Sequence, residues 1–259
     1  MKARSRLRMV AIVAAGVISA VAQLPSFSQT TNLSITVVPG YNLISLPLKN
    51  TNDSINTVLT NTYYNGNPQV TPGGCSIFTW DPVHARFNPA IYAGGDGNWY
   101  NEDFTLATLP LPPGLGFFFQ LITPSQQQGS GDPPPFVTNL TIVVTGKILT
   151  GTNSYPVTSG YNFYGNFEPT TNDICKNGFP VVDGSDLMTW NGYGYGQALY
   201  GLGTNDSAPD LSGNPGQYPG FIDQDFTQIV PVTPPVGSAF LYYYVGPNTN
   251  WTQIYSVGP

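Results

Sequence analysis

After residue 22, glycine or proline interrupts nearly every ten-residue window of this chain, which has 29 glycines and 25 prolines among its 259 residues. Proline removes a helical hydrogen bond and glycine weakens helices, so long helices are disfavoured throughout. The intervening stretches are rich in Val, Thr, Tyr and Phe, which favour short strands bounded by turns. With 41% hydrophobic and 13% aromatic residues, the chain has enough apolar side chains for a core. The sequence predicts an all-β protein with no helix after its N-terminal segment.

Five short motifs recur in the same order along the chain. They are GYN at 40–42 and 160–162, IFTW at 77–80 and LMTW at 187–190, NEDFT at 101–105 and DQDFT at 223–227, LPPGLGFFF at 111–119 and TPPVGSAFL at 233–241, and NLTIVVT at 139–145 and NWTQIYS at 250–256. Five collinear matches, shifted only in the loops between them, indicate duplication. We therefore expect two tandem homologous β-sandwich or barrel-like modules, at residues 30–146 and 147–259.

Within these predicted modules, several local features follow from the motifs. GFFFQLI is a continuous apolar run, as expected of a strand covered on both faces. The tyrosine and asparagine of GYN are expected to be a packed ring and a hydrogen-bonding group beside a turn. In the fourth motif, Val236 stands where the first copy has Gly114. The polar stretch at 124–135, PSQQQGSGDPPP, is expected to be an insertion loop inside the first module.

The N-terminus has the pattern of a secretory signal peptide over residues 1–22. Four basic residues precede an apolar run at 9–22, which ends in the A-x-A cleavage pattern at 20–22; Ser28 marks a second candidate cleavage position. The run is shorter than the roughly 20 apolar residues that span a bilayer, so an uncleaved anchor is the weaker alternative. We expect a secreted or cell-surface protein with no membrane span after removal of the signal.

Removal of residues 1–22 makes the chain strongly acidic. Four basic residues (Lys49, Arg86, Lys147 and Lys176) would remain against 14 acidic residues, a formal net charge of −10. Binding to nucleic acid or to anionic lipid depends on clusters of basic side chains. This charge balance therefore excludes nucleic acid as a partner.

Cys75 and Cys175 are the only cysteines, and an even number in an exported protein favours a disulfide. Such a bridge would join the two predicted modules, and closing a loop of that length would contribute about 4.7 kcal/mol. Two buried thiols that are not bonded to each other are the alternative.

Residues suited to catalysis are few. His84 is the single histidine, it lies in the turn-like segment DPVHARF, and no G-x-S-x-G motif is present. Asp96, Glu102 and Asp103 lie together in GGDGNWYNED, where they offer oxygen ligands for a possible calcium ion, although Asp-Gly is above all a turn signal. The sequence predicts no enzyme, and no cofactor other than a possible calcium ion.

A loop dense in glycine and tyrosine, NGYGYGQALYGLG at 191–203, carries Tyr193, Tyr195 and Tyr200. Uncharged aromatic faces on a loop suit carbohydrate or protein partners. With Trp99 of the first predicted module, these tyrosines are the candidate ligand-binding residues. The alternative is a partly packed loop without a ligand.

The order of the GYN strand, the tryptophan strand, the L-P-P-G-x-G-F-F-F segment and the closing N-W-T-x-x-Y-S-V segment resembles uncharacterised secreted tandem-repeat β proteins of planctomycete- and verrucomicrobium-type bacteria. In that group, a G-[YWF]-N-L-I-[SG]-x-P strand and an L-x-P-G-x-G-F-[FW] strand recur in tandem. The resemblance implies a repeated β module and supplies no catalytic residues.

These observations together predict a secreted, non-enzymatic structural or interaction protein of the cell surface or extracellular matrix. The first alternative is a carbohydrate-binding module, with calcium as an optional aid to binding, whose partner would be a surface polysaccharide. The second is a self-assembling fibre subunit, because neutral Thr/Asn-rich strand edges can pair between chains.

Overall fold

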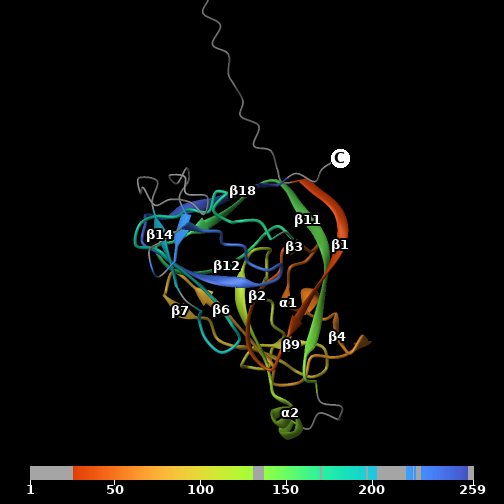
Figure 1. The fold of residues 1–259 in the computed structure, drawn as a ribbon. Helices are drawn as coiled ribbons and strands as arrows, with labels where there is room; N and C mark the ends of the chain where they lie inside the picture. Colours follow the sequence, from red (N-terminus) through yellow and green to blue (C-terminus); the bar gives the residue numbers. More distant parts are fainter. Residues whose placement is uncertain are drawn as a thin grey trace, which may run out of the picture.

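The computed structural model of the protein describes residues 26–130, 137–169, 171–196, 198–202, 220–223, 225 and 229–255. These residues form three sheets in which every paired strand is antiparallel (Figure 1). The all-β prediction is therefore confirmed. The predicted signal peptide, residues 1–22, lies outside the described residues.

Each sheet contains six strands. The first sheet is formed by β1 (Ser26–Val37), β11 (Leu140–Val157), β4 (Thr62–Tyr64), β5 (Asn67–Pro68), β3 (Leu48–Lys49) and β18 (Thr249–Tyr255). The second is formed by β2 (Gly40–Ser45), β10 (Gly116–Leu121), β6 (Ser76–Asp81), β8 (Ile91–Ala93), β9 (Trp99–Tyr100) and β7 (Arg86–Phe87). The third is formed by β12 (Gly160–Gly165), β17 (Ala239–Tyr244), β13 (Asp186–Thr189), β14 (Leu199–Leu202), β15 (Gly220–Ile222) and β16 (Ile229–Val230).

Strand β11 joins the two predicted modules without a break. It is 18 residues long, and its first part pairs with β1 as far as Thr150. Its last part, from Gly151 onward, pairs with β18; in Figure 1, β11 is green and β18 is dark blue. The expected boundary at 146/147 thus lies inside one strand. The division into two homologous modules stays a prediction; below, the first half means β1 to β10 and the second half means β12 to β18, with β11 shared.

The second and third sheets pair their central strands in the same order, β2-β10-β6 and β12-β17-β13. Phe118 of β10 lies opposite Leu43 and Phe78 in its two neighbours. Leu241 of β17 lies opposite Phe163 and Met188 in the corresponding strands. The GYN, tryptophan and apolar strands of the two halves therefore occupy corresponding places in their sheets.

Three hydrophobic clusters hold the sheets together. One cluster lies in the first half, one in the second, and the third lies between the second and third sheets, around Phe118, Phe163 and Leu241. Strand β10 serves two of them: Phe117 and Phe119 belong to the first core, and Phe118 on the opposite face belongs to the cluster between the sheets. The expectation that GFFFQLI is covered on both faces is confirmed.

The expectation of no helix was wrong at two short places. Helix α1 (Ile55–Val58) is one turn, and α2 (Pro124–Ser130) begins in the stretch expected to be an insertion loop. Thr123 and Gln126 form the reciprocal bonds of a capping box: the Gln126 side chain accepts from the Thr123 N–H at 2.8 Å, and the Thr123 hydroxyl accepts from the Gln126 N–H at 3.4 Å. Pro124 fits the first helical position, where no N–H is needed.

The predicted match of Val236 with Gly114 was also wrong. Strand pairing places Gly116 opposite Ser45 and Ala239 opposite Gly165. The residue two positions earlier in each turn is therefore a glycine, and both Gly114 (φ 80°) and Gly237 (φ 84°) adopt the left-handed conformation. Both turns are closed by the same backbone bond, from the Leu115 N–H to Pro112 O at 3.2 Å and from the Ser238 N–H to Pro235 O at 2.9 Å, so the second copy keeps the glycine at the position where the turn requires it.

Cys75 and Cys175, which both lie in described ranges, are not joined by a disulfide, so the predicted bridge was wrong. Cys75 is buried in the core of the first half and Cys175 in the core of the second. Each side chain therefore fills space inside its own core. Burial, together with the neighbouring Asp173, raises the pKa of the Cys175 thiol and keeps it protonated.

Candidate functional site

The second and third sheets are connected by two reciprocal indole hydrogen bonds. Trp80, on β6, donates from Nε1 to the backbone oxygen of Tyr161 at 2.7 Å. Trp190, directly after β13, donates from Nε1 to the backbone oxygen of Tyr41, also at 2.7 Å. The tryptophan of each half is thus fixed against the GYN strand of the other half.

Behind each tryptophan, the chain turns back and places a second aromatic ring against the indole. Trp80 pairs with Phe87 across a hairpin, with ring centroids 5.1 Å apart and near-perpendicular planes. Trp190 pairs with Tyr195 in the same way, at 5.2 Å. Two aromatic hairpins, one from each half, therefore lie beside the cluster between the sheets.

These rings surround two neighbouring hollows, which we call the aromatic groove. The first hollow, of about 320 Å³, is lined by Tyr41, Phe78, Phe87, Phe118 and Trp190. The second, of about 300 Å³, is lined by Trp80, Phe87, Tyr161, Phe163, Met188, Tyr195 and Leu241. Phe87 belongs to both, and each hollow takes its tryptophan from the opposite half.

The groove combines exposed rings with a rigid base. Tyr41, Phe87, Tyr161 and Tyr195 are each between 40% and 44% exposed. The first three lie on strands, so their positions are set by sheet hydrogen bonds. Among the described residues, no charged side chain lines either hollow. Partial burial, and secondarily the nearby Tyr161, raises the pKa of Tyr195, so its phenol is neutral at physiological pH.

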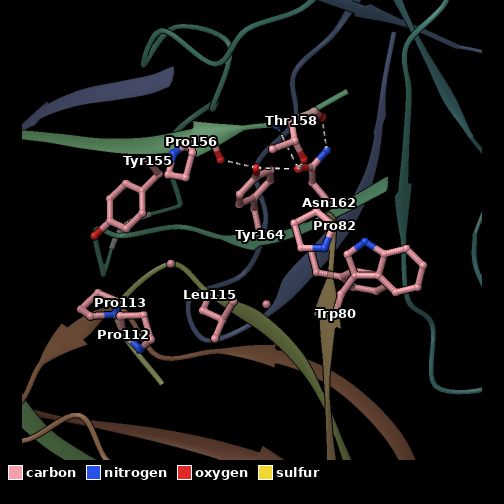
Figure 2. A pocket seen from close by; sticks show the side chains of 13 residues that line it. Trp80, Pro82, Pro112, Pro113, Leu115, Tyr155, Pro156, Thr158, Asn162 and Tyr164 are labelled. Atoms are coloured by element: carbon pink, nitrogen blue, oxygen red, sulfur yellow. Dashed lines mark hydrogen bonds between the residues drawn. The ribbon is translucent and has the colours of Figure 1, made fainter. Parts of the chain in front are cut away.

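A third, more enclosed pocket lies behind Trp80, where the Pro-Pro turn of the first half meets the second half. Figure 2 shows Pro112 and Pro113 on one side of this pocket and Trp80 on the other. The Tyr164 hydroxyl donates to the backbone oxygen of Pro156 at 2.6 Å and lies 3.0 Å from Asn162 Oδ1. Because these polar atoms already bond to one another, the pocket has few groups left to orient a ligand.

The candidate ligand-binding residues named from the sequence do not come together. Trp99 is only 1% exposed and packs edge-on against Phe119 in the first core, with ring centroids 5.7 Å apart. A ligand cannot stack on this buried ring. Tyr193 is 98% exposed at the tip of a turn, and Tyr200 is half-buried in β14. Tyr195 alone lies in the aromatic groove.

The acidic residues proposed as calcium ligands serve local turns. Asp96 accepts from the Tyr100 hydroxyl at 2.6 Å and from Asn98, and these bonds lower the pKa of Asp96 to about 2. Asp103 accepts from the hydroxyl of Thr105 at 2.6 Å, and Glu102 is exposed. In the described ranges, no three His, Cys, Asp or Glu side chains are grouped in a way that could hold a metal ion.

His84 lies in the hairpin turn between Trp80 and Phe87. Its Nδ1 is 2.6 Å from Asp81 Oδ2, and Asp81 also accepts the backbone N–H groups of Val83 and His84. The hydrogen bond from His84 is the largest cause of the lowered pKa of Asp81. His84 lies in a turn, as its segment DPVHARF predicted, and its side chain is 63% exposed.

Most of the groove was missed by reasoning from the sequence. The asparagines of GYN do bond beside a turn as expected: Asn42 Oδ1 accepts the Val38 N–H at 3.0 Å, and Asn162 Oδ1 accepts the Thr158 N–H at 3.2 Å. The tyrosines of the two GYN motifs, Tyr41 and Tyr161, were expected to be packed rings, but they are partly exposed at the groove. The signal available was the tryptophan repeated at the end of IFTW and LMTW, each followed by a turn and another aromatic residue.

No helix in the described part of the chain is long and apolar enough to cross a membrane. Comparison of the chain with protein-family models, with curated proteins and with solved structures found no match.

Proposed function

We propose that this chain is a secreted, non-enzymatic interaction protein that holds an extracellular partner in its aromatic groove. One observation carries the proposal: partly exposed aromatic rings from both halves surround two adjoining, uncharged hollows on a base of paired strands. Contiguous exposed apolar surface of this kind marks interaction sites in soluble proteins.

The energetics of recognition favour such a site. Tyrosine and tryptophan supply large contact areas with few rotatable bonds, and they are enriched among the residues that dominate binding energy. The two indole hydrogen bonds between the halves hold the walls in place before a partner arrives. Preorganisation of this kind lowers the entropy lost on binding. The signal-like N-terminus supports a location outside the cell.

The proposal is tested with labelled protein added to the envelope and matrix fraction of the cells that secrete it. We expect Phe87→Ala to reduce retention about tenfold, because Phe87 lines both hollows. Tyr92→Ala is the matched control: Tyr92 is 41% exposed on the same sheet but lines neither hollow. Equal retention of both variants would reject the groove as the site.

A second candidate function, self-assembly into fibres, is favoured by strand β1. This strand has 12 residues with no charge and no proline, and among the described residues it pairs with β11 alone. Neutral edge strands can pair between chains. Size-exclusion chromatography at rising concentration should then show oligomers that Ser34→Lys reduces, and a constant monomer peak would reject this function.

A further inference from the structure

We propose that the aromatic groove binds an uncharged polysaccharide, with one sugar unit in each hollow. This inference rests on the proposed function and names the class of partner. It draws on three independent properties of the groove: the absence of charge, the unused hydrogen-bonding groups, and the repetition of the hollow.

The absence of charge selects against ionic partners. The described residues that line the two hollows include no charged side chain, and the chain after residue 22 has only four basic residues against 14 acidic ones. Anionic glycans and acidic peptides would find no counter-charge in the groove. A sugar ring presents C–H bonds on its flat faces, and these meet the negative face of an aromatic ring favourably.

The hydrogen-bonding groups of the groove match those of a sugar. Each sugar hydroxyl can both donate and accept a hydrogen bond. Here the Nε1 groups of Trp80 and Trp190 already donate to Tyr161 and Tyr41 backbone oxygens at 2.7 Å. The groups left at the rim are phenol hydroxyls, which both donate and accept, as the hydroxyls of a sugar do.

The repetition of the hollow favours a polymer over a single small molecule. The two hollows are built from corresponding positions of the two halves, and the pairs are Tyr41 and Tyr161, Phe78 and Met188, Phe87 and Tyr195, Phe118 and Leu241, and Trp190 and Trp80. Phe87 also contributes to the second hollow, so the two sites adjoin. A chain of repeated units can fill both sites at once, and linkage of two weak contacts raises the overall affinity.

The test uses the secreted protein in native gels that contain one soluble neutral glycan each: a β-1,4-glucan, a β-1,3-glucan, a xylan and a mannan. A gel with polygalacturonate tests an anionic polymer. We expect retardation in at least one neutral gel and none in polygalacturonate. In calorimetry with matching oligosaccharides, affinity should rise from disaccharide to hexasaccharide as both hollows become filled.

Substitutions separate the two hollows. Phe87→Ala should weaken binding of the polymer by at least about tenfold, whereas Tyr41→Ala and Tyr195→Ala should each weaken it less by removing one hollow. Tyr92→Ala and Tyr193→Ala should leave it unchanged. Circular dichroism of each variant checks folding, and if Phe87→Ala is unfolded, the combined Tyr41→Ala and Tyr195→Ala variant takes its place.

Tryptophan fluorescence gives a second readout on the unmodified protein. The chain has four tryptophans; Trp99 and Trp251 are fully buried in the cores, while Trp80 and Trp190 line the groove. Bound glycan should shift the emission and protect the signal from iodide quenching, and Trp190→Phe should reduce this response.

The inference is overturned if no neutral glycan retards the protein, if polygalacturonate alone does, or if retardation survives loss of the groove rings. These results are distinguishable from failure of the proposed function. Retention on the envelope fraction that depends on Phe87, without binding to any neutral glycan, would leave the groove as an interaction site and reject the polysaccharide.

Discussion

The core of the first half is built mainly from isoleucine, leucine and valine, whereas the core of the second half is built mainly from phenylalanine, tyrosine and tryptophan. The same order of paired strands accommodates both the aliphatic core and the aromatic core. Ile142 lies opposite Ile35 in the first half, and Trp251 lies opposite Tyr155 in the corresponding pair of strands. Strand order therefore does not dictate which side chains fill a core.

The aromatic core of the second half has an additional requirement. The hydroxyl groups of its tyrosines and the indole N–H of its tryptophan must be hydrogen-bonded when they are buried. The Tyr164 and Tyr242 hydroxyls donate to the backbone oxygens of Pro156 and Pro180, each at 2.6 Å. The Trp251 Nε1 donates to the backbone oxygen of Asn177 at 3.2 Å. The loops of the second half must therefore hold carbonyl groups at defined places, a constraint that an aliphatic core does not impose.

The largest expected effect on the free energy of unfolding comes from removing one large buried side chain from each core and comparing the two losses. Trp251→Ala should lower the free energy of unfolding by about 3–5 kcal/mol, because it removes a fully buried ring and its hydrogen bond. Ile142→Ala, which removes a fully buried side chain from the first core, should cost less, about 2–4 kcal/mol. Urea denaturation followed by circular dichroism measures both.

The same experiment tests whether the halves unfold together. Since β11 belongs to both halves and the indole bonds connect their sheets, each variant should show a single shifted transition. Two separate transitions, with only one moved by Trp251→Ala, would show that the halves unfold independently.

The next largest effect concerns the two turn glycines. A Cβ added at Gly114 would lie 1.7 Å from Phe167 Cδ1, and that ring is itself stacked on Tyr155. A Cβ at Gly237 would lie 2.7 Å from the more adaptable Ile35 side chain. With the left-handed conformation also disfavoured, Gly114→Ala should destabilise by about 2–4 kcal/mol and Gly237→Ala by less. Thermal unfolding of both variants measures the difference, and equal effects would contradict the proposed role of the Phe167 ring.

Raising the pH should also distinguish the two cores, with a smaller effect on the free energy of unfolding than the substitutions above. Burial, and secondarily Asp53, raises the pKa of Tyr155 to about 12, and burial also raises the pKa of Tyr164 and Tyr242. In the unfolded chain these phenols ionise near pH 10, while the folded protein keeps them neutral. The stability from the neutral form is therefore complete below about pH 10 and is lost as pH rises towards the folded pKa values.

We expect Tyr164→Phe and Tyr242→Phe to lose less stability than the unmodified protein between about pH 10 and pH 12. At neutral pH each should cost about 1 kcal/mol for its hydrogen bond. Urea denaturation across this pH range measures how steeply the free energy of unfolding falls with pH. Tyr193→Phe, at an exposed position, is the control. An unchanged slope in both core variants would mean that these phenols do not drive the alkaline loss.

The smallest expected effect is that of a reducing agent. Because Cys75 and Cys175 lie in separate cores and are not joined by a disulfide, dithiothreitol should leave the melting temperature unchanged. Cys175→Ala should cost stability equally with and without dithiothreitol, since it removes packing and the contact with Asp173 but no disulfide. A fall in melting temperature on reduction would contradict this placement of the cysteines.

Local patterns predicted much of the strand architecture and little of the candidate site. The apolar run GFFFQLI, the asparagines of GYN and the turn role of His84 were readable because each depends on neighbours close in sequence. The capping box at Thr123 was equally local, and it was overlooked because Pro and Gly dominated the expectation for that stretch. The groove depends on Trp80 reaching Tyr161 and Trp190 reaching Tyr41, contacts that no local pattern specifies.

By itself, the sequence determined the all-β fold class and the succession of strands along the chain, because these follow from backbone preferences and side-chain patterns over a few residues. Only the tertiary structure decided that β11 is one strand shared by both halves, that the cysteines occupy separate cores, and that Trp99 is buried while Tyr41, Phe87, Tyr161 and Tyr195 surround a groove. The physical reason is that burial and contact between distant segments depend on how whole sheets pack, and the same aromatic residue is a core filler or a binding surface according to that packing.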